Sequence, residues 1–372
     1  MMKTKTGLYI HIPFCAKKCN YCDFCSFSNV GESVRSKYIE KLCQEIDSYK
    51  AKNVIVDTIF FGGGTPTLLT AKEFANIVDH IKEAFLIDDN VEFTVEANPG
   101  TTDRQKLVDF VKCGVNRFSI GLQSIHEKEL KKLGRIHDFG EFKQTYLDLK
   151  SIGIDNVNID LMYGIPYQTL ESFEKTLDVV LNLAPEHLSV YGLILEEGTP
   201  FYSEQDTLDL PGEDSECDMY FLAAKKLAEK GYIHYEVSNY SKAGKESRHN
   251  LKYWHCNEYI GIGVSAHSYF ENKRYSNTDS IYDYINDTSQ MFFSEQLDVD
   301  TQKYEYVMLA LRLKRGFSLS EYYSRFSENF LAGREEFIEK MVSLGYINLI
   351  DDNISLTEKG FYVSNSILSE LL

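Results

Sequence analysis

Short apolar runs alternate with longer amphipathic stretches over about the first 200 residues of the chain. Six runs are apolar on both faces, which is typical of strands covered by helices: 7–12, 58–61, 91–97, 117–121, 156–162 and 187–195. Between these runs, apolar positions recur at helical spacing over 37–49, 71–85, 103–113, 139–152 and 170–183. Repeated strand–helix units predict a parallel sheet with right-handed crossovers, and six units are too few for a closed eight-stranded barrel. We therefore predict an α/β fold built on a partial (β/α)6 barrel that is open at one side.

The pattern changes beyond this region. The polar, acidic stretch 206–215 predicts a connection, and it is followed by a helix over 216–230 and β-rich segments around 232–240 and 259–268. From about residue 299, three helices precede a small β-ribbon and a last helix, an order that is similar to a winged helix. We therefore predict three domains: a partial barrel over 1–205, a β-rich extension over 206–298 and an α+β, winged-helix-like C-terminal domain over 299–372.

Charge and hydropathy exclude several classes of function. The formal charge of −17 disfavours nucleic acid as a partner, because a phosphate backbone needs a basic surface. The winged-helix-like region does not reverse this, since 301–372 holds eight Lys and Arg against ten Asp and Glu. No apolar run approaches the ~18 residues of a membrane span, and the first residues lack the apolar core of a secretion signal. These features predict a cytoplasmic protein.

The cysteines carry the strongest chemical signal. Cys15, Cys19 and Cys22 form a C-x3-C-x2-C pattern after the first predicted strand, and four of the eight cysteines fall within eleven positions, which argues against a disulfide framework. Three thiolates are one short of the four ligands that a fully protein-bound 4Fe–4S cluster takes. A zinc site is the alternative, but zinc favours four ligands and no second C-x2-C pair follows. We predict a 4Fe–4S cluster with one iron left open to a small molecule.

Polar residues occur where the predicted strands end. A Gly-Gly-Gly-Thr-Pro-Thr turn follows the second strand, Glu96 ends the third, Gln123 follows the fourth and Asp160 lies near the end of the fifth. Each alone is compatible with a turn or a capping role. The reactive groups of parallel folds lie at the carboxyl ends of the strands, so we expect these residues and the cysteines to share one rim.

The C-x3-C-x2-C pattern resembles the signature of the radical S-adenosylmethionine superfamily. The resemblance implies that Cys15, Cys19 and Cys22 bind three irons, and that the amino and carboxylate groups of S-adenosylmethionine bind the fourth. Reductive cleavage of S-adenosylmethionine then yields methionine and a 5′-deoxyadenosyl radical. The glycine turn corresponds to the motif whose backbone carbonyls face the methionyl ammonium, and Tyr21 is placed to pack on the adenine.

Further motifs resemble the oxygen-independent coproporphyrinogen oxidase branch, and within it the HemW-type heme chaperones. The matching segments are Y-I-H-I-P-F-C, F-G-G-G-T-P-T, E-A-N-P, S-I-G-L-Q-S, L-G-R-I-H and N-I-D-L-M-Y-G-I-P, in family order from residue 9 onward. The resemblance implies a radical S-adenosylmethionine barrel whose cofactor pocket is lined by Tyr9, Gly63, Gly64, Thr65, Glu96, Gln123, Arg135 and Asp160. Carboxylates and the glutamine accept hydrogen bonds from ribose hydroxyls or the ammonium, and Arg135 pairs with the carboxylate.

Two departures separate the chain from the oxidase. The oxidase continues its cysteine pattern as C-x-C, whereas Phe24 occupies that position here and Cys25 follows it. The oxidase also carries a long N-terminal extension, and only eight residues precede Tyr9. Both differences argue against decarboxylation of coproporphyrinogen. Cys25 is a spare thiol, a fourth ligand in a resting state or an intermolecular contact.

A downstream motif points to heme. His249, Asn250, Tyr253 and Trp254 match the H-N-x-x-Y-W pattern that marks the heme chaperones, and Trp254 is the only tryptophan of the chain. Imidazole is a common axial ligand of heme iron, and the two aromatic side chains are suited to stack on a porphyrin. Alternatively, His249 and Asn250 close a loop while the aromatic residues enter the core. His255, Cys256 and His267 are competing ligands.

These features predict a heme chaperone that binds heme and transfers it to an acceptor protein, and that carries a 4Fe–4S cluster and S-adenosylmethionine. A membrane-associated respiratory component is a candidate acceptor, and the sequence leaves a homodimer open. The alternative function is a radical enzyme that oxidatively decarboxylates coproporphyrinogen III or acts on another tetrapyrrole. A zinc-dependent structural protein is the third class of function.

Overall fold

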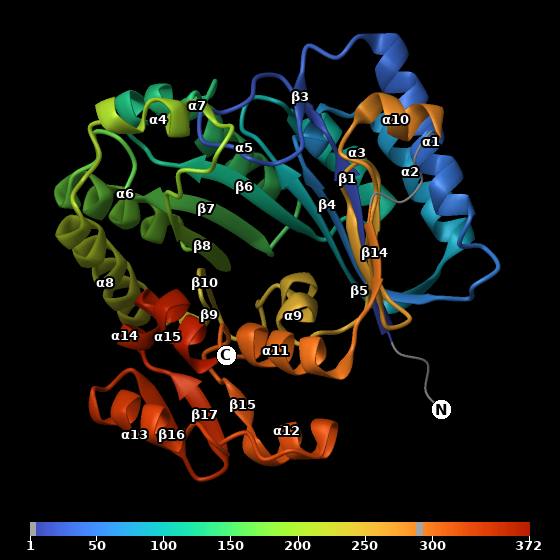
Figure 1. The fold of residues 1–372 in the computed structure, drawn as a ribbon. Helices are drawn as coiled ribbons and strands as arrows, with labels where there is room; N and C mark the ends of the chain where they lie inside the picture. Colours follow the sequence, from blue (N-terminus) through green and yellow to red (C-terminus); the bar gives the residue numbers. More distant parts are fainter. Residues whose placement is uncertain (1–4, 288–292) are drawn as a thin grey trace.

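A twelve-stranded sheet dominates the computed structural model, which describes residues 5–287 and 293–372 (Figure 1). Its strand order is β14-β13-β12-β11-β1-β4-β5-β6-β7-β8-β10-β9, and every pair from β11 to β8 is parallel. The six strands of the barrel are β1 (Lys5–Ile12), β4 (Ile55–Gly63), β5 (Leu86–Ala97), β6 (Arg117–Gln123), β7 (Val157–Tyr163) and β8 (His187–Gly192). Within the described residues the two edge strands do not pair with each other, so the α/β partial barrel is open, as predicted.

The segments after residue 205 extend this sheet at both edges. On one side β11 (Tyr259–Ile262) pairs in parallel with β1, followed by antiparallel β12 (His267–Phe270), β13 (Lys273–Ser276) and β14 (Phe293–Gln296). On the other side, β10 (Asn239–Ser241) pairs with β8, and β9 (Ile233–Glu236) pairs with β10. The β-rich extension therefore shares a sheet with the barrel. Residues 1–4 and 288–292, which fall in the first two predicted domains, lie outside the described residues.

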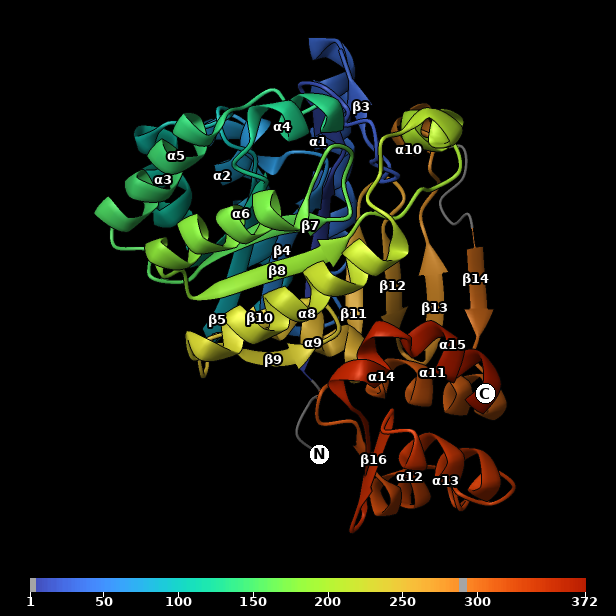
Figure 2. The ribbon, with the colours of Figure 1, turned by 90° about the vertical axis from the view of Figure 1, so that its left-hand side faces the viewer.

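Helices cover one face of the parallel sheet (Figures 1 and 2). α1 (Glu32–Asp47), α2 (Ala71–Ala84), α3 (Arg104–Cys113) and α5 (Phe139–Ser151) pack side by side in this order, and α6 (Leu170–Leu183) packs against α8 (Glu213–Glu229). Local signals explain their bounds: the Thr70 hydroxyl accepts from the Glu73 amide at the start of α2, and Gly114 ends α3 with φ of 118°. The shorter elements here are α4 (Glu127–Leu133), α7 (Pro200–Ser203), α9 (Arg248–Trp254), α10 (Ile281–Asn286), and the 3-10 turns Pro66–Leu68 and Gln205–Thr207.

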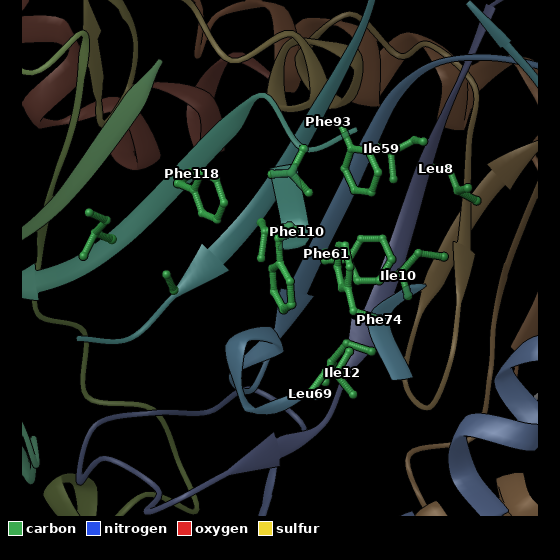
Figure 3. Packing of buried hydrophobic residues seen from close by; sticks show 14 of the residues in the cluster. Leu8, Ile10, Ile12, Ile59, Phe61, Leu69, Phe74, Phe93, Phe110 and Phe118 are labelled. Carbon is green, nitrogen blue, oxygen red and sulfur yellow. The ribbon is translucent and has the colours of Figure 1, made fainter. Parts of the chain in front are cut away.

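The main hydrophobic core lies between the sheet and these helices (Figure 3). Phe61 of β4 and Phe93 of β5 point toward α2 and α3, where the rings of Phe74 and Phe110 stack with centroids 4.0 Å apart. All four side chains are buried. Burial of large aromatic side chains is a major source of folding free energy, so this layer fixes the strand ends that carry the site.

The C-terminal region builds a second, smaller core. It contains a three-stranded sheet in the order β15-β17-β16. Along the chain, helices come before, between and after these strands. Phe317, Tyr322 and Phe330 pack at its centre. Tyr220 from α8 contacts Tyr362 of this core and Tyr163 of β7, and so joins the core to the barrel. No helix among residues 5–287 and 293–372 is long and apolar enough to span a bilayer. The elements of this region are α11 (Val299–Ala310), β15 (Phe317–Ser318), α12 (Leu319–Phe326), α13 (Glu335–Ser343), β16 (Ile347–Ile350), β17 (Asn353–Leu356), α14 (Glu358–Tyr362) and α15 (Ser364–Leu371).

Candidate functional site

The cysteine loop lies at the carboxyl end of β1 and is held from several sides. β2 (Phe14–Cys15) pairs with β3 (Phe27–Ser28), and the Asn20 amide donates to the carbonyl of Leu133 at 2.9 Å. The Asn20 side chain donates to the carbonyl of Lys132 at 2.8 Å. These contacts fix a loop that has little regular structure of its own.

The three cysteines face one cavity of about 410 Å³ at this end of the barrel. The Thr65 hydroxyl lies 3.8 Å from the Cys15 sulfur and donates to it, and the Arg135 guanidinium donates to the Cys19 sulfur at 3.7 Å. Hydrogen bonds to cysteine sulfur are among the features that set the potential of an iron–sulfur cluster. Within the described residues, no three His, Cys, Asp or Glu side chains are grouped as they are around a single metal ion. Cys15, Cys19 and Cys22 line one cavity, so they fit a cluster that takes one thiol per iron.

The glycine turn packs directly against the cysteine loop. The Gly64 amide donates to the carbonyl of Ile12 at 2.8 Å, and a Cβ at Gly64 would lie 2.7 Å from the carbonyl oxygen of Phe14. Gly63 has φ of 104°, and a Cβ there would lie 2.5 Å from the His11 ring. Both positions therefore require glycine, because a side chain there would clash with the His11 ring or with the backbone of Phe14.

Two carboxyl groups enter the cavity from neighbouring strands. Glu96 is the last residue but one of β5 and accepts from the Gly63 backbone amide at 3.3 Å. Asp160 of β7 accepts from the side-chain amide of Asn158 at 2.6 Å. Burial and the nearby Asp160 carboxyl raise the pKa of Glu96 from 4.5 to about 8. Burial also raises the pKa of Asp160. Such carboxyl groups favour a cationic ligand, because a bound cation offsets the cost of ionising them.

Arg135 follows α4 and reaches into the same cavity. It donates to the Gly121 carbonyl and to the Asn98 side chain, the latter at 2.8 Å. Its Nε is buried without a hydrogen-bond partner among the described residues, so one donor is available to an anionic ligand. The predicted residues that line this cavity are Cys15, Cys19, Cys22, Tyr21, Gly63, Gly64, Thr65, Glu96, Gln123, Arg135, Asp160 and Asn250. Their roles in binding stay predictions.

Tyr9 lies behind the glycine turn rather than on the cavity wall. Its hydroxyl is 3.0 Å from Nδ1 of His11, and Nε2 of His11 is 2.8 Å from the Cys25 carbonyl oxygen. The position of Tyr9 indicates that it supports the cysteine loop through His11. Cys25 itself donates its thiol to the carbonyl of Asp279 at 3.4 Å.

The H-N-x-x-Y-W segment forms α9 at the opposite end of the barrel (Figure 1). His249 is 1% exposed; its Nδ1 is 2.9 Å from the Thr58 hydroxyl and its Nε2 is 2.8 Å from the Tyr253 hydroxyl. Burial lowers the pKa of His249 to about 3, so the ring is neutral. Iron ligation by His249 would require one of these hydrogen bonds to break, and it stays a prediction. Of this motif only Asn250 reaches the barrel cavity, and the described structure places Trp254 outside its lining.

The barrel interior also contains polar residues that the sequence motifs did not predict as part of the site. Arg117, Asn158 and His187 line the cavity from below, and His187 Nδ1 is 2.6 Å from the Asn158 side-chain oxygen. Arg117 is 2% exposed, so it places a buried cation beneath the two carboxyl groups. The available signal was a period-two polar pattern in β6, β7 and β8, where Ser119, Asp160 and Ser189 follow these residues by two positions.

Comparisons with known proteins agree with this geometry. The Radical SAM superfamily model matches residues 9–180, and the HemN C-terminal domain model matches residues 297–363. The heme chaperone HemW of Lactococcus lactis subsp. lactis (strain IL1403) is 35% identical over 376 residues, covering 100% of this chain and 98% of that protein. The chain belongs to the HemW family.

Other comparisons support this membership of the HemW family. Heme chaperone HemW of Escherichia coli (strain K12) is 35% identical and covers 98% of both chains. The structure of coproporphyrinogen III oxidase (HemN) from Escherichia coli superposes with a TM-score of 0.88 at 22% identity, over 99% of this chain and 90% of that chain. At this identity the superposition shows a common fold, and the resemblance to the radical S-adenosylmethionine superfamily and the HemW-type proteins is confirmed.

Proposed function

We propose that this protein is a heme chaperone, which binds heme and transfers it to an acceptor protein. The observation that carries the proposal is the match to HemW proteins along their whole length, through the C-terminal domain as well as the barrel. The likeness to the oxidase concerns the fold alone. Heme is therefore the cargo of the protein.

The radical S-adenosylmethionine domain brings a 4Fe–4S cluster and S-adenosylmethionine as cofactors. Cys15, Cys19 and Cys22 would hold the cluster, since the three free thiols face one cavity. Thr65 and Arg135 donate hydrogen bonds to two of these sulfurs and so favour the thiolate form. When bound, the two cofactors supply one-electron chemistry.

The remaining cavity groups suit the methionyl and ribose parts of S-adenosylmethionine. Glu96 and Asp160 would accept from ammonium and hydroxyl groups, and the Arg135 guanidinium would pair with the carboxylate. Gly63 and Gly64 line the cavity, where a backbone without side chains can approach the ligand closely. Tyr21 supplies a ring at the cavity wall for the adenine.

The location and the acceptor extend this proposal. All eight cysteines are free thiols, which supports a cytoplasmic location, because disulfides are rare in that compartment. The acceptor would be a heme protein, such as a membrane-associated respiratory component. The chaperone itself would act as a monomer or as a homodimer. The acceptor follows from the proposed chaperone function.

Anaerobic reconstitution tests the proposal directly. The protein is loaded with iron and sulfide, titrated with hemin by absorption spectroscopy and then mixed with an apo-globin as a heme acceptor. We expect about one heme per chain, movement of the heme spectrum to the globin fraction, and no carbon dioxide from coproporphyrinogen III in the presence of S-adenosylmethionine and a reductant. Failure to bind heme would reject the chaperone, and carbon dioxide release matched to loss of coproporphyrinogen would favour the oxidase.

A further inference from the structure

A second cavity lies at the junction of the barrel and the C-terminal domain. It has a volume of about 320 Å³ and is enclosed by the end of α9, strands β11 to β13 and helices α11 and α12. It shares no lining residue with the cysteine cavity. We call it the α9–α11 pocket. Its volume falls in the range of roughly 300–1,000 Å³ that is common for small-molecule sites.

The walls of the α9–α11 pocket are aromatic and largely apolar. Tyr253 and Tyr259 meet edge to face with ring centroids 4.6 Å apart, and Leu297, Met308 and Leu309 contribute aliphatic surface. Tyr253 belongs to the H-N-x-x-Y-W segment, so the pocket adjoins the motif typical of the HemW family. A porphyrin is a planar, mostly apolar ligand, and aromatic and aliphatic walls are the surfaces that it packs against.

Two arginines give the pocket a charged side. Arg274 pairs with Glu305 and lies 3.4 Å from Glu295, so its charge is balanced by carboxylates. Arg325 instead lies over the rings of Tyr306 and Phe326, at 5.0 and 5.5 Å from their centroids, and no carboxylate of the described chain pairs with it. Arg325 is exposed, so an acidic group of a ligand can reach it from solvent. A heme propionate is a carboxylate, and it could therefore form the ion pair that Arg325 does not form within the described chain.

The pocket also contains a donor atom suitable for iron. Cys256 lies two residues beyond α9 in a left-handed conformation, with φ of 51°, and its thiol is free. Cysteine thiolate is one of the axial ligands that proteins supply to heme iron. Burial raises the pKa of Cys256 to about 11; the neighbouring Arg325 and Arg274 lower this pKa, and the Glu305 carboxylate raises it. Iron binding would release the thiol proton to water, because a coordinating thiol is deprotonated.

We infer that heme binds in the α9–α11 pocket, with the Cys256 sulfur as an axial ligand and Arg325 paired with a propionate. This inference rests on the proposed chaperone function and adds the site to it. It differs from ligation by His249, whose two ring nitrogens already form hydrogen bonds inside the barrel. The cargo would then lie at the end of the barrel opposite the cysteine loop, next to the C-terminal domain.

Hemin titration of the full-length, cluster-loaded protein tests the site. Arg325→Glu reverses the free cation, and Leu309→Trp fills the pocket; we expect each to weaken heme binding by at least about tenfold. Arg104→Glu, at an exposed arginine of α3, is the matched control and should leave the affinity unchanged. Unchanged iron and sulfide content and thermal midpoint show that each variant is folded.

A second set of variants tests the Cys256 sulfur as the axial ligand of heme iron. Cys256→Ala should change the absorption spectrum of bound heme, whereas Cys113→Ala, at a half-buried thiol of α3, should not. Wild-type protein that binds one heme, together with pocket variants that bind it equally tightly, would overturn the pocket while the chaperone function stands. Wild-type protein that binds no heme would overturn the function itself. An unchanged spectrum in Cys256→Ala would reject this cysteine as the ligand.

Discussion

At the scale of one residue, the buried carboxyl group of Glu96 lowers the stability of the folded protein when it is ionised, and it also provides an acceptor for a cationic ligand. Its carboxyl group is placed beside Asp160, and burial together with this neighbour raises its pKa from 4.5 to about 8. The folded protein binds the Glu96 proton more tightly than the unfolded chain does, and this difference stabilises the folded state. The stabilisation by this proton is fully present below pH 4.5 and is lost as the pH rises through about 8.

Glu96→Gln should therefore stabilise the cofactor-free protein under basic conditions. We expect its free energy of unfolding to exceed that of the wild type at pH 8.5 by at least about 1.4 kcal/mol, the value of one pKa unit, and to differ little at pH 4. The same variant should bind S-adenosylmethionine more weakly, because the carboxylate partner of the ammonium is gone. Denaturant unfolding at both pH values and a binding titration measure the two effects. Glu83→Gln, at an exposed position, is the control.

His249→Ala tests whether this residue is a core residue or a ligand. The substitution removes hydrogen bonds to Thr58 and Tyr253 and a stacked contact with Phe60, so we expect the free energy of unfolding to fall by about 2–4 kcal/mol. Heme affinity and spectrum should remain those of the wild type. Thr58→Val, which keeps the imidazole, should lower stability less. Loss of the heme spectrum in a folded His249→Ala protein would instead support axial ligation by His249.

At the scale of elements, one strand residue holds α9 in place. Glu92 of β5 is 6% exposed, and its two carboxylate oxygens accept from the backbone amides of Arg248 and His249, each at 3.0 Å. The first turn of a helix has unpaired amides and a positive end, so a carboxylate there is doubly favourable. This contact closes the barrel end with the H-N-x-x-Y-W segment.

Glu92→Ala should release this end of the barrel. Two buried amides lose their acceptor, so we expect a loss of about 2–4 kcal/mol in the free energy of unfolding and faster hydrogen exchange of the α9 amides. Glu92→Gln retains one acceptor oxygen and should give an intermediate result. Full protection of the α9 amides in Glu92→Ala would show that the helix is held by its side chains alone.

Elements with a strong local pattern could be predicted from the sequence, and those defined by distant pairing could not. Each of these barrel strands carries a mainly buried run with apolar residues, and the cysteine and glycine motifs lie at the strand ends. By contrast, β11 pairs with β1 although about 250 residues separate Gly7 from Tyr259, and no local pattern encodes that partner. The burial of His249 has the same origin, since it depends on Thr58 and Glu92 from other strands.

At the scale of the whole molecule, the barrel separates two chemically different cavities. The cysteine cavity is lined by three thiols, two carboxyl groups and a guanidinium, and it lies at the carboxyl ends of the strands, where the loops carry Cys15 and Arg135. The α9–α11 pocket is lined by α9 and α11, which contact each other, and these two helices lie at the other end of the barrel (Figures 1 and 2). A chaperone that uses both would keep its cargo away from the cluster.

The separation predicts that cluster binding and heme binding can be removed independently. Replacing Cys15, Cys19 and Cys22 together with alanine should abolish bound iron and sulfide and weaken S-adenosylmethionine binding. Heme stoichiometry should remain about one per chain, because the two cavities share no lining residue. Leu309→Trp should give the reverse result, with normal iron and sulfide and weak heme binding.

The Asn20 contacts to Leu133 and Lys132 anchor the loop without the thiols, so the triple variant should fold, as circular dichroism and thermal melting would verify. A folded triple variant that binds no heme would mean that the cluster itself forms part of the heme site, and the two-cavity arrangement would then be wrong.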